Sequence, residues 1–204
     1  MPRPKRFARR CSGGRHVVTT PRLALRSLTV ADLPLAAAAA SDREAQRWLG
    51  WKREDLVAEE ERDRLLSAPA GRGRARFGLP SRCVPTGMLA VDPENGLPAG
   101  ILWLTPESPD LCELGGYLAP SYRGRGLGAE LFAAGLALAQ GHLHFTEVRA
   151  GVQRENVRCA RSLWRAGLDP ASGPEKHVLP DGRVIPSDWY SSVVPDPAWC
   201  GSAW

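Results

Sequence analysis

The segment "YLAPSYRGRGLGAEL" (residues 117–131) places a Gly- and Arg-rich loop between an apolar strand-like run and an apolar helix-like run. Glycines allow positive φ angles and let the backbone approach a ligand closely. Successive backbone N–H groups of such a loop converge on an anion, and the helix behind it adds the positive end of its dipole. Arg123 and Arg125 add full positive charges. The segment therefore predicts a pyrophosphate site, because a simple turn leaves two arginines at a helix N-terminus unexplained.

Two other nucleotide-binding loops fit this segment less well. The spacing Gly124-x-Gly126-x-x-Ala129 matches the dinucleotide-binding fingerprint. That turn, however, directly follows the first strand of its unit, whereas here the polar spacer "APSYR" intervenes after a run of several expected strands. A P-loop is excluded because no Gly-Lys-Ser/Thr follows the glycines.

Hydrophobic periodicity predicts the elements that hold this loop. Strands are expected at 23–28, 87–91, 99–104, 111–118 and 145–152, helices at 29–50, 52–68, 127–140 and 156–168, and a closing hairpin at 177–193. Thr29 or Asp32 is expected to cap the first helix, and residues 69–82 are expected to form a loop leading to a strand. The order strand, helix, strand over 111–152 predicts a parallel pair with a right-handed crossover.

The helix at 156–168 has a clear start and a clear apolar stripe. Asn156 stands where an N-cap belongs. Ala160, Leu163, Trp164 and Gly167 follow at helical spacing, so they are expected to form the buried face.

Composition indicates one globular domain. The chain has 204 residues, of which 43% are hydrophobic and 24% charged. No apolar run is long enough to span a bilayer, and the start lacks the apolar stretch of a secretory signal, so a cytoplasmic location is expected. Five widely spaced cysteines without a C-x-x-C pair, and no His pair at zinc spacing, predict reduced thiols and no metal site.

The net charge of +5 belongs to the N-terminal segment. Residues 1–15 contain six cations and no acid, and removing six from 27 leaves 21 basic against 22 acidic residues. We expect residues 1–15 to be a disordered basic tail, residues 16–193 to be the domain, and residues 194–204 to be a Pro-rich extension. Such a tail could also bind nucleic acid or an acidic protein surface.

Arg123-x-x-Gly126-x-Gly128 resembles the R/Q-x-x-G-x-G/A signature of the GNAT superfamily of acetyl-CoA-dependent N-acyltransferases. The resemblance extends over about residues 17–193 and is nearest to the subgroup that acetylates ribosomal-protein N-termini: "TPRLALRSL" is similar to its first strand, "RENVRCARSLWRAGL" to its Asn-led helix and "DGRVIPSDWYSSV" to its closing hairpin. It implies an α/β fold with a mixed, mostly antiparallel sheet of about seven strands. The family's fourth and fifth strands run parallel and splay apart, and helices flank both faces.

The resemblance also implies where acetyl-CoA binds. Backbone N–H groups of the loop at 123–128 would hold the pyrophosphate, and the strand edge near Tyr117, Leu118 and Ala119 would hold the pantetheine arm. A backbone N–H there, assigned to Leu118, would polarise the thioester carbonyl. Asn156 would contact the pantetheine arm, and Cys159 stands where related sequences often carry Ser. The cofactor-binding set is therefore Tyr117, Leu118, Ala119, Arg123, Gly124, Arg125, Gly126, Leu127, Gly128 and Asn156.

The acid and base are less clear, because two residues that relatives use for proton transfer are missing. Gly151 occupies the position of a Glu, and Leu163 the position of a Tyr. Glu113 is the best remaining base, although its alternative is an ordinary exposed strand carboxylate. Tyr190 is the first candidate for the acid, with Ser191 and Tyr122 as weaker ones.

The acceptor wall is expected to come from the first two helices and the last hairpin. Trp48 and Trp51 are interpreted either as pocket lining or as core, and Asp42, Glu44 and Glu113 as carboxylates that attract a cationic amine or are simply solvated.

These observations predict an N-acetyltransferase that moves an acetyl group directly to a primary amine, on a protein N-terminus or a small molecule. Two alternatives stay open: a CoA-binding protein with little or no turnover, and a ribosome- or RNA-associated protein acting through its basic tail. A homodimer is compatible with the sequence, and a membrane partner is not expected.

Overall fold

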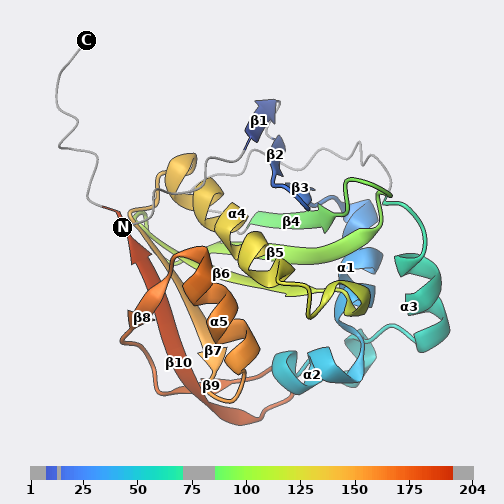
Figure 1. Cartoon of the computed structure of the whole chain (residues 1–204). Helices are drawn as coiled ribbons and strands as arrows, with labels where there is room; N and C mark the ends of the chain where they lie inside the picture. The colour runs from blue at the N-terminus through green and yellow to red at the C-terminus, as the bar shows by residue number, and fades with distance from the viewer. Residues whose placement is uncertain (1–7, 13–14, 71–85, 195–204) are drawn as a thin grey trace.

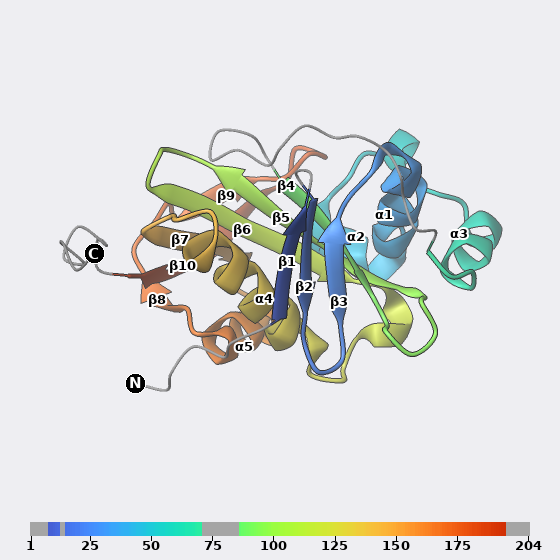
Figure 2. The ribbon, with the colours of Figure 1, turned by 90° about the horizontal axis from the view of Figure 1, so that it is seen from above.

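Ten strands form one mixed sheet in the computed structural model, which describes residues 8–12, 15–70 and 86–194 (Figure 1). The spatial order is β1 (Ala8–Ser12), β2 (Arg15–Thr19), β3 (Ala24–Ser27), β4 (Thr86–Val91), β5 (Pro98–Pro106), β6 (Leu111–Leu118), β7 (Glu147–Gln153), β10 (Val184–Val193) and β8 (Asp169–Ala171). Strand β9 (Lys176–Val178) pairs with the first part of β10. Seen from above, β1, β2 and β3 run side by side at one end of this sheet (Figure 2).

Helices cover both faces of the sheet, and the apolar side chains of the strands explain where they pack. Helices α4 (Leu127–Gly141) and α5 (Val157–Ala166) lie on one face, where Cys112 and Leu114 of β6 enter the main core. Helix α1 (Leu33–Ala40) packs on the other face, where the Tyr117 hydroxyl donates to the Ala36 carbonyl at 3.0 Å. Helices α2 (Arg43–Leu49) and α3 (Glu59–Leu66) follow it.

Strands β6 and β7 separate after a short parallel ladder. Their register ends at the pair Glu113–Arg149, whereas β6 continues to Leu118 and β7 to Gln153. Every other strand pair within the described residues is antiparallel. The predicted fold class, with a splayed parallel pair in a mostly antiparallel sheet, is confirmed, although the described sheet has ten strands rather than about seven.

Three predicted boundaries differ from the structure. The helix expected at 29–50 is interrupted, because the Asp42 side chain accepts hydrogen bonds from the N–H groups of Glu44 and Ala45 and starts α2. The second helix begins at Glu59 instead of residue 52, after a short 3-10 turn. Strand β1 lies inside the segment expected to be a disordered tail, so residues 8–12 do not fit that prediction.

Other predictions concern residues outside the described ranges. The first seven residues of the tail, residues 71–82 of the expected loop and residues 195–204 of the extension belong to this group. The closing hairpin is confirmed, with Gly182 at a φ of 86° in its turn. No helix within the described residues is long and apolar enough to cross a membrane.

Candidate active site

The loop that enters α4 presents its backbone N–H groups without acceptors. Gly124 and Gly126 have φ angles of 72° and 76°, a conformation that costs glycine little. No acceptor for the N–H groups of Gly124, Arg125, Gly126 or Leu127 lies among the described residues, and no side chain caps the helix at Gly126. Because α4 is 15 residues long, its dipole adds positive potential at this end. The loop therefore has the shape and sign of an anion cradle.

Arg22, on the turn between β2 and β3, adds a cation that the sequence did not reveal. Its Nη1 donates to the Arg125 carbonyl at 2.9 Å, and its Nε pairs with Glu130 at 2.9 Å. Glu130 also accepts hydrogen bonds from the Thr20 hydroxyl and the Arg22 N–H. Burial opposes the charged form, but these bonds hold the pKa of Glu130 below its usual value. Glu130 thus fixes Arg22 beside the loop.

Arg123 forms a structural ion pair with Asp42 and is not a free phosphate ligand. Its guanidinium contacts both Asp42 carboxylate oxygens at 2.6 and 2.7 Å, and its Nε donates to the Leu118 carbonyl at 2.9 Å. Burial alone would raise the pKa of Asp42, but the hydrogen bonds from Arg123 hold it below its usual value. The expected full charge of Arg123 is therefore neutralised by Asp42, which also removes Asp42 as an attractor for an amine. Arg125 is exposed and stacks over Tyr122 at 5.7 Å.

The edge of β6 that faces the gap is defined by strand register. Ala119 donates its N–H to the Ala99 carbonyl at 2.9 Å, so it faces β5. Alternation along an antiparallel strand turns Tyr117 to the same side and turns Gly116 and Leu118 toward β7. The predicted edge residues Tyr117 and Ala119 therefore do not present their N–H groups to the gap. Leu118 does, and Gly116 joins it.

Helix α5 closes the cradle from the side. Asn156 caps it, accepting from the Cys159 N–H at 3.1 Å, as predicted. A side chain at Gly128 would meet the Ser162 hydroxyl at 2.9 Å, which shows how closely α4 and α5 approach. Burial raises the pKa of Cys159 to about 12, so this thiol is not an activated nucleophile. Trp164, expected in the buried stripe, is 62% exposed, whereas Leu163 is buried.

Glu113 lies at the closed end of the gap, on the α1 face of the sheet. It is half-buried and pairs in register with Arg149. Burial raises the pKa of Glu113, and the like charge of Glu107 adds to this, while Arg149 and His177 act in the opposite direction. A carboxylate with a raised pKa is a suitable proton acceptor near neutral pH.

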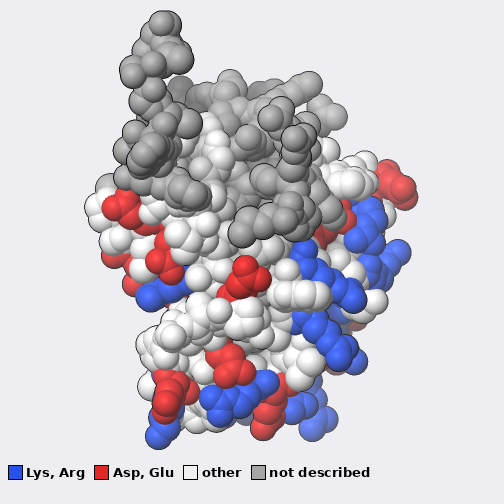
Figure 3. All heavy atoms as spheres, turned by 60° about the vertical axis from the view of Figure 1, so that its left-hand side comes forward, with Lys and Arg blue, Asp and Glu red and all other residues white. Residues whose placement is uncertain are grey.

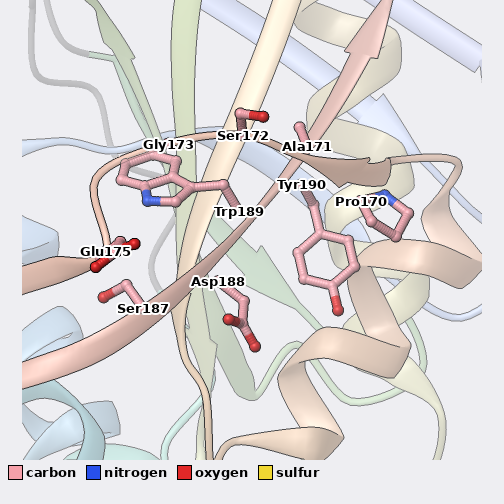
Figure 4. A pocket seen from close by; sticks show the side chains of 9 residues that line it. All are labelled: Pro170, Ala171, Ser172, Gly173, Glu175, Ser187, Asp188, Trp189 and Tyr190. Carbon is pink, nitrogen blue, oxygen red and sulfur yellow. The ribbon is translucent and has the colours of Figure 1, made fainter.

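The structure does not bring Tyr190 to Glu113. Tyr190 pairs with Ala150, whose side chain faces the main core, so it leaves the sheet on the face opposite Glu113 and Arg149. Figure 4 shows Tyr190 and Trp189 projecting to opposite sides of β10. Strand β7 separates Tyr190 from the gap. Tyr122 is buried, and its hydroxyl contacts Asp92 at 3.1 Å, so neither tyrosine is placed as the expected acid.

Comparisons with known proteins show the family and the fold. Residues 22–169 match the family described as acetyltransferase (GNAT) domain. The chain belongs to the GNAT family of acetyltransferases. No curated protein matches the chain.

Solved GNAT structures share its fold. Spermidine N-acetyltransferase from Vibrio cholerae, in complex with CoA and spermine, is 15% identical, with a TM-score of 0.63 over 85% of this chain and 96% of that chain. RimL, a ribosomal alpha-N-protein acetyltransferase in complex with coenzyme A, is 15% identical, with a TM-score of 0.64 over 87% and 98%. An aminoglycoside acetyltransferase in complex with coenzyme A is 19% identical, with a TM-score of 0.59 over 88% and 99%. These similarities establish the fold and leave the acceptor open.

The α1 face of this acetyltransferase is open above Gly115, two residues after Glu113 on β6. A β-carbon added at Gly115 would meet nothing within 4 Å. Trp103 is the cross-strand neighbour of Gly115, and Tyr117 follows on the same face of β6. Trp51 meets Tyr117 edge to face, with ring centroids 5.7 Å apart. Burial raises the pKa of Tyr117 well above its usual value, so it remains a neutral wall.

Trp48 and Trp51 are both half-buried, so each is neither fully core nor fully exposed as pocket lining. Trp51 contacts Tyr117, which lies on the open α1 face of β6. The Trp48 carbonyl accepts a hydrogen bond from the Gln153 side chain at 2.7 Å, and the Trp48 ring stacks against Arg47 at 4.5 Å. Glu44 lies near Arg158, at 3.3 Å, on the exposed surface.

Gly151 and Leu163, the two departures from the GNAT pattern, have clear structural settings. A β-carbon added at Gly151 would lie 3.1 Å from the Trp189 ring, so the indole of β10 packs directly against this glycine. Leu163 is part of the main core. A depression of about 400 Å³ lies beside β10, near Ser187 and Glu175; Trp189 and Tyr190 line it, but Glu113 and Arg149 do not (Figure 4).

Charge on the surface is mixed. In Figure 3, acidic and basic side chains lie interspersed over the lower part of the face, and basic ones gather along its right-hand side. Among the described residues, no cluster of His, Cys, Asp and Glu has the arrangement of a metal site.

Proposed function

We propose that this protein transfers an acetyl group from acetyl-CoA directly to a primary amine in the gap between β6 and β7. One observation carries the proposal: an anion cradle stands at the open end of the gap and a half-buried carboxylate at its closed end. Leu118 and Glu113 are five residues apart on β6, or roughly 16 Å along an extended strand. The gap thus joins a phosphate site to a proton acceptor through an unpaired strand edge.

Acetyl-CoA would bind along this edge. The N–H groups of residues 124–127, with Arg22 and Arg125 beside them, would hold the pyrophosphate. The N–H groups of Gly116 and Leu118 face the gap and would bind the pantetheine arm and the thioester oxygen. Asn156 keeps its side-chain N–H groups for the same arm, because only its oxygen is used as the cap.

The reaction would begin with the removal of a proton from the acceptor amine. Glu113 would take a proton from the ammonium form of the acceptor, and the neutral nitrogen would attack the thioester carbon. The backbone N–H of Gly116, the nearer of the two to Glu113, would stabilise the negative oxygen of the tetrahedral intermediate, rather than that of Leu118. The carbon–sulfur bond breaks, the nitrogen gives up its second proton to solvent as the amide forms, and CoA leaves as the thiolate and takes a proton from solvent. Neither Tyr190 nor Leu163 is placed to supply it.

The test replaces Glu113→Gln and measures CoA thiol release with a panel of primary amines. We expect kcat to fall about 100-fold or more, because general-base catalysis contributes at least that much, while acetyl-CoA binding is unchanged. Wild-type activity should fall as the pH drops through the raised pKa of Glu113. The control Glu107→Gln removes a like charge, so it should move this fall to lower pH and keep activity at high pH.

Two results would oppose the proposal. Full activity of Glu113→Gln would remove Glu113 from the reaction. Tight acetyl-CoA binding by the wild type without turnover of any amine would favour the alternative of a catalytically silent CoA-binding protein.

A further inference from the structure

Arg149 is a partly buried guanidinium without hydrogen bonds. Its side chain is 30% exposed, its Nε is fully buried without a partner, and its ion pair with Glu107 is long, at 3.9 Å. Among the described residues, none of its guanidinium N–H groups donates a hydrogen bond. A guanidinium has five donors, and buried charges in proteins are normally paired and hydrogen-bonded. Arg149 therefore lacks a partner that a ligand would supply.

The guanidinium is held in position by an aromatic platform. It stacks over Trp189, with its central carbon 5.0 Å from the ring. The indole N–H donates to the Pro174 carbonyl at 2.8 Å, and a side chain at Gly173 would clash with the ring, so the segment before β9 lies against it (Figure 4). Gly151 leaves room for the other side of the indole. This setting presents the guanidinium in a fixed orientation.

The position of Arg149 selects the kind of ligand. It pairs in register with Glu113 at the closed end of the gap and leaves the sheet on the same face. The cradle for the CoA pyrophosphate lies at the other end of β6, so Arg149 is not placed to hold that phosphate. The remaining substrate is the acceptor. A planar fork of N–H donors matches a carboxylate, which accepts two parallel hydrogen bonds.

We propose that the acceptor is a free amino acid or a similar small amine that carries a carboxylate next to its amino group. Glu113 receives the ammonium group and Arg149 the carboxylate. Neighbouring strands lie about 4.8 Å apart, so paired residues bind groups that are separated by only one or two atoms. The open space above Gly115 then takes the side chain. This inference rests on the proposed function and names the substrate class of the same site.

The test compares matched acceptors. Each of a panel of amino acids is assayed with acetyl-CoA beside its carboxamide and its decarboxylated amine. We expect kcat/KM for at least one amino acid to exceed that of both analogues by about 10-fold or more, because a site built to hydrogen-bond a substrate group rejects analogues that lack it. At a pH above the raised pKa of Glu113, which Arg149 itself lowers, Arg149→Met should raise the KM for the amino acid and leave the decarboxylated amine unchanged, and Arg149→Lys should restore part of the loss.

The control is Arg154→Met. Arg154 follows β7 on the exposed surface and pairs with Asp188 at 3.1 Å, so its loss removes the same charge without touching the gap. Equal kcat/KM values for amino acids and their decarboxylated amines in the wild type would overturn the inference. A uniform loss for all acceptors in Arg149→Met would also overturn it, because Arg149 would then act only by positioning Glu113 and would not bind the carboxylate of the acceptor.

Binding separates this inference from the proposed function. Amino acids are titrated calorimetrically into the protein saturated with CoA, so no turnover is needed. Binding by the wild type that is lost in Arg149→Met supports the inference even where no amine is acetylated. Amine turnover without measurable amino-acid binding supports the proposed function and overturns the inference.

Discussion

The two ends of the gap between β6 and β7 are built in different ways. At the open end, the cradle consists of backbone N–H groups from consecutive residues, 124–127, and is fixed by two glycines and a helix start. At the closed end, Glu113, Arg149 and Trp189 come from three strands and meet only through sheet register. A site made of neighbouring backbone groups can be identified from one segment of sequence. A site made of side chains from distant segments requires the fold.

The largest expected effect breaks the open end alone. In Gly126→Glu, a side chain replaces glycine at a φ of 76° and brings a negative charge into the cradle. We expect acetyl-CoA binding to weaken by 100-fold or more, measured by calorimetry, with the fold retained by circular dichroism. The control Gly182→Glu makes the same change at a φ of 86° in the distant hairpin turn, where a side chain has open space. Unchanged binding in Gly126→Glu would place the pyrophosphate elsewhere.

A second, intermediate effect concerns the ion pair between Asp42 and Arg123, which holds the start of α2 against the loop at the open end. Asp42→Asn keeps a good N-cap for α2 but removes the charge that pairs with Arg123. The two side chains are only 15% and 21% exposed, so we expect a loss of about 3 kcal/mol in the free energy of unfolding at pH 7, measured by urea denaturation.

The pH dependence of this loss provides its own check. The folded pKa of Asp42 is lowered, so the pair stabilises the protein above the unfolded pKa of about 3.9 and this stabilisation disappears as pH falls through the folded pKa. Wild type and Asp42→Asn should therefore converge in acid. The exposed pair Asp181–Arg183 provides a control, since Asp181→Asn should cost much less. Equal losses of unfolding free energy in Asp42→Asn and Asp181→Asn would show that the Asp42–Arg123 pair contributes no more than an exposed ion pair.

The smallest effect sharpens the closed end. Gly115→Val places two methyl groups in the open space on the α1 face next to Glu113, where a β-carbon meets nothing within 4 Å. We expect the KM for the acceptor to rise several-fold while the dissociation constant of acetyl-CoA is unchanged, because acetyl-CoA would bind along the N–H edge of Gly116 and Leu118 and at the loop 124–127, and not on the α1 face above Gly115. An increase in the acetyl-CoA constant alone would place this open space on the cofactor side.

Much of the scaffold was predictable because its signals are local. The bounds of β6 coincide with the expected strand at 111–118, and α4 and the Asn156 cap follow from periodicity and capping. The break between α1 and α2 was missed because five alanines and a charged run favour one continuous helix, whereas Asp42 stops it by capping α2. Trp164 fits the helical stripe by spacing but lies on the exposed edge of α5.

The site was predictable only in part, for the same reason. Residues of the loop at 123–128 were identified from their own sequence, but the side chain of Arg123 binds Asp42, 81 residues away in the chain. Arg22 and Arg149 have no local signal, since each is an ordinary strand or turn arginine until the sheet forms. Tyr190 was chosen for its chemistry, and the alternation of β10 places it on the opposite face from Glu113.

The contact between Gly151 and Trp189 implies a rule for changing the acceptor. One strand has given up its side chain so that an indole from the next strand can fill the same volume. A β-carbon at position 151 would lie 3.1 Å from the indole, so the ring has to shift by a few tenths of an ångström to admit a side chain, and this shift moves the surface on which Arg149 rests. The two positions are therefore coupled, and a change of acceptor class at position 151 has to be designed together with position 189.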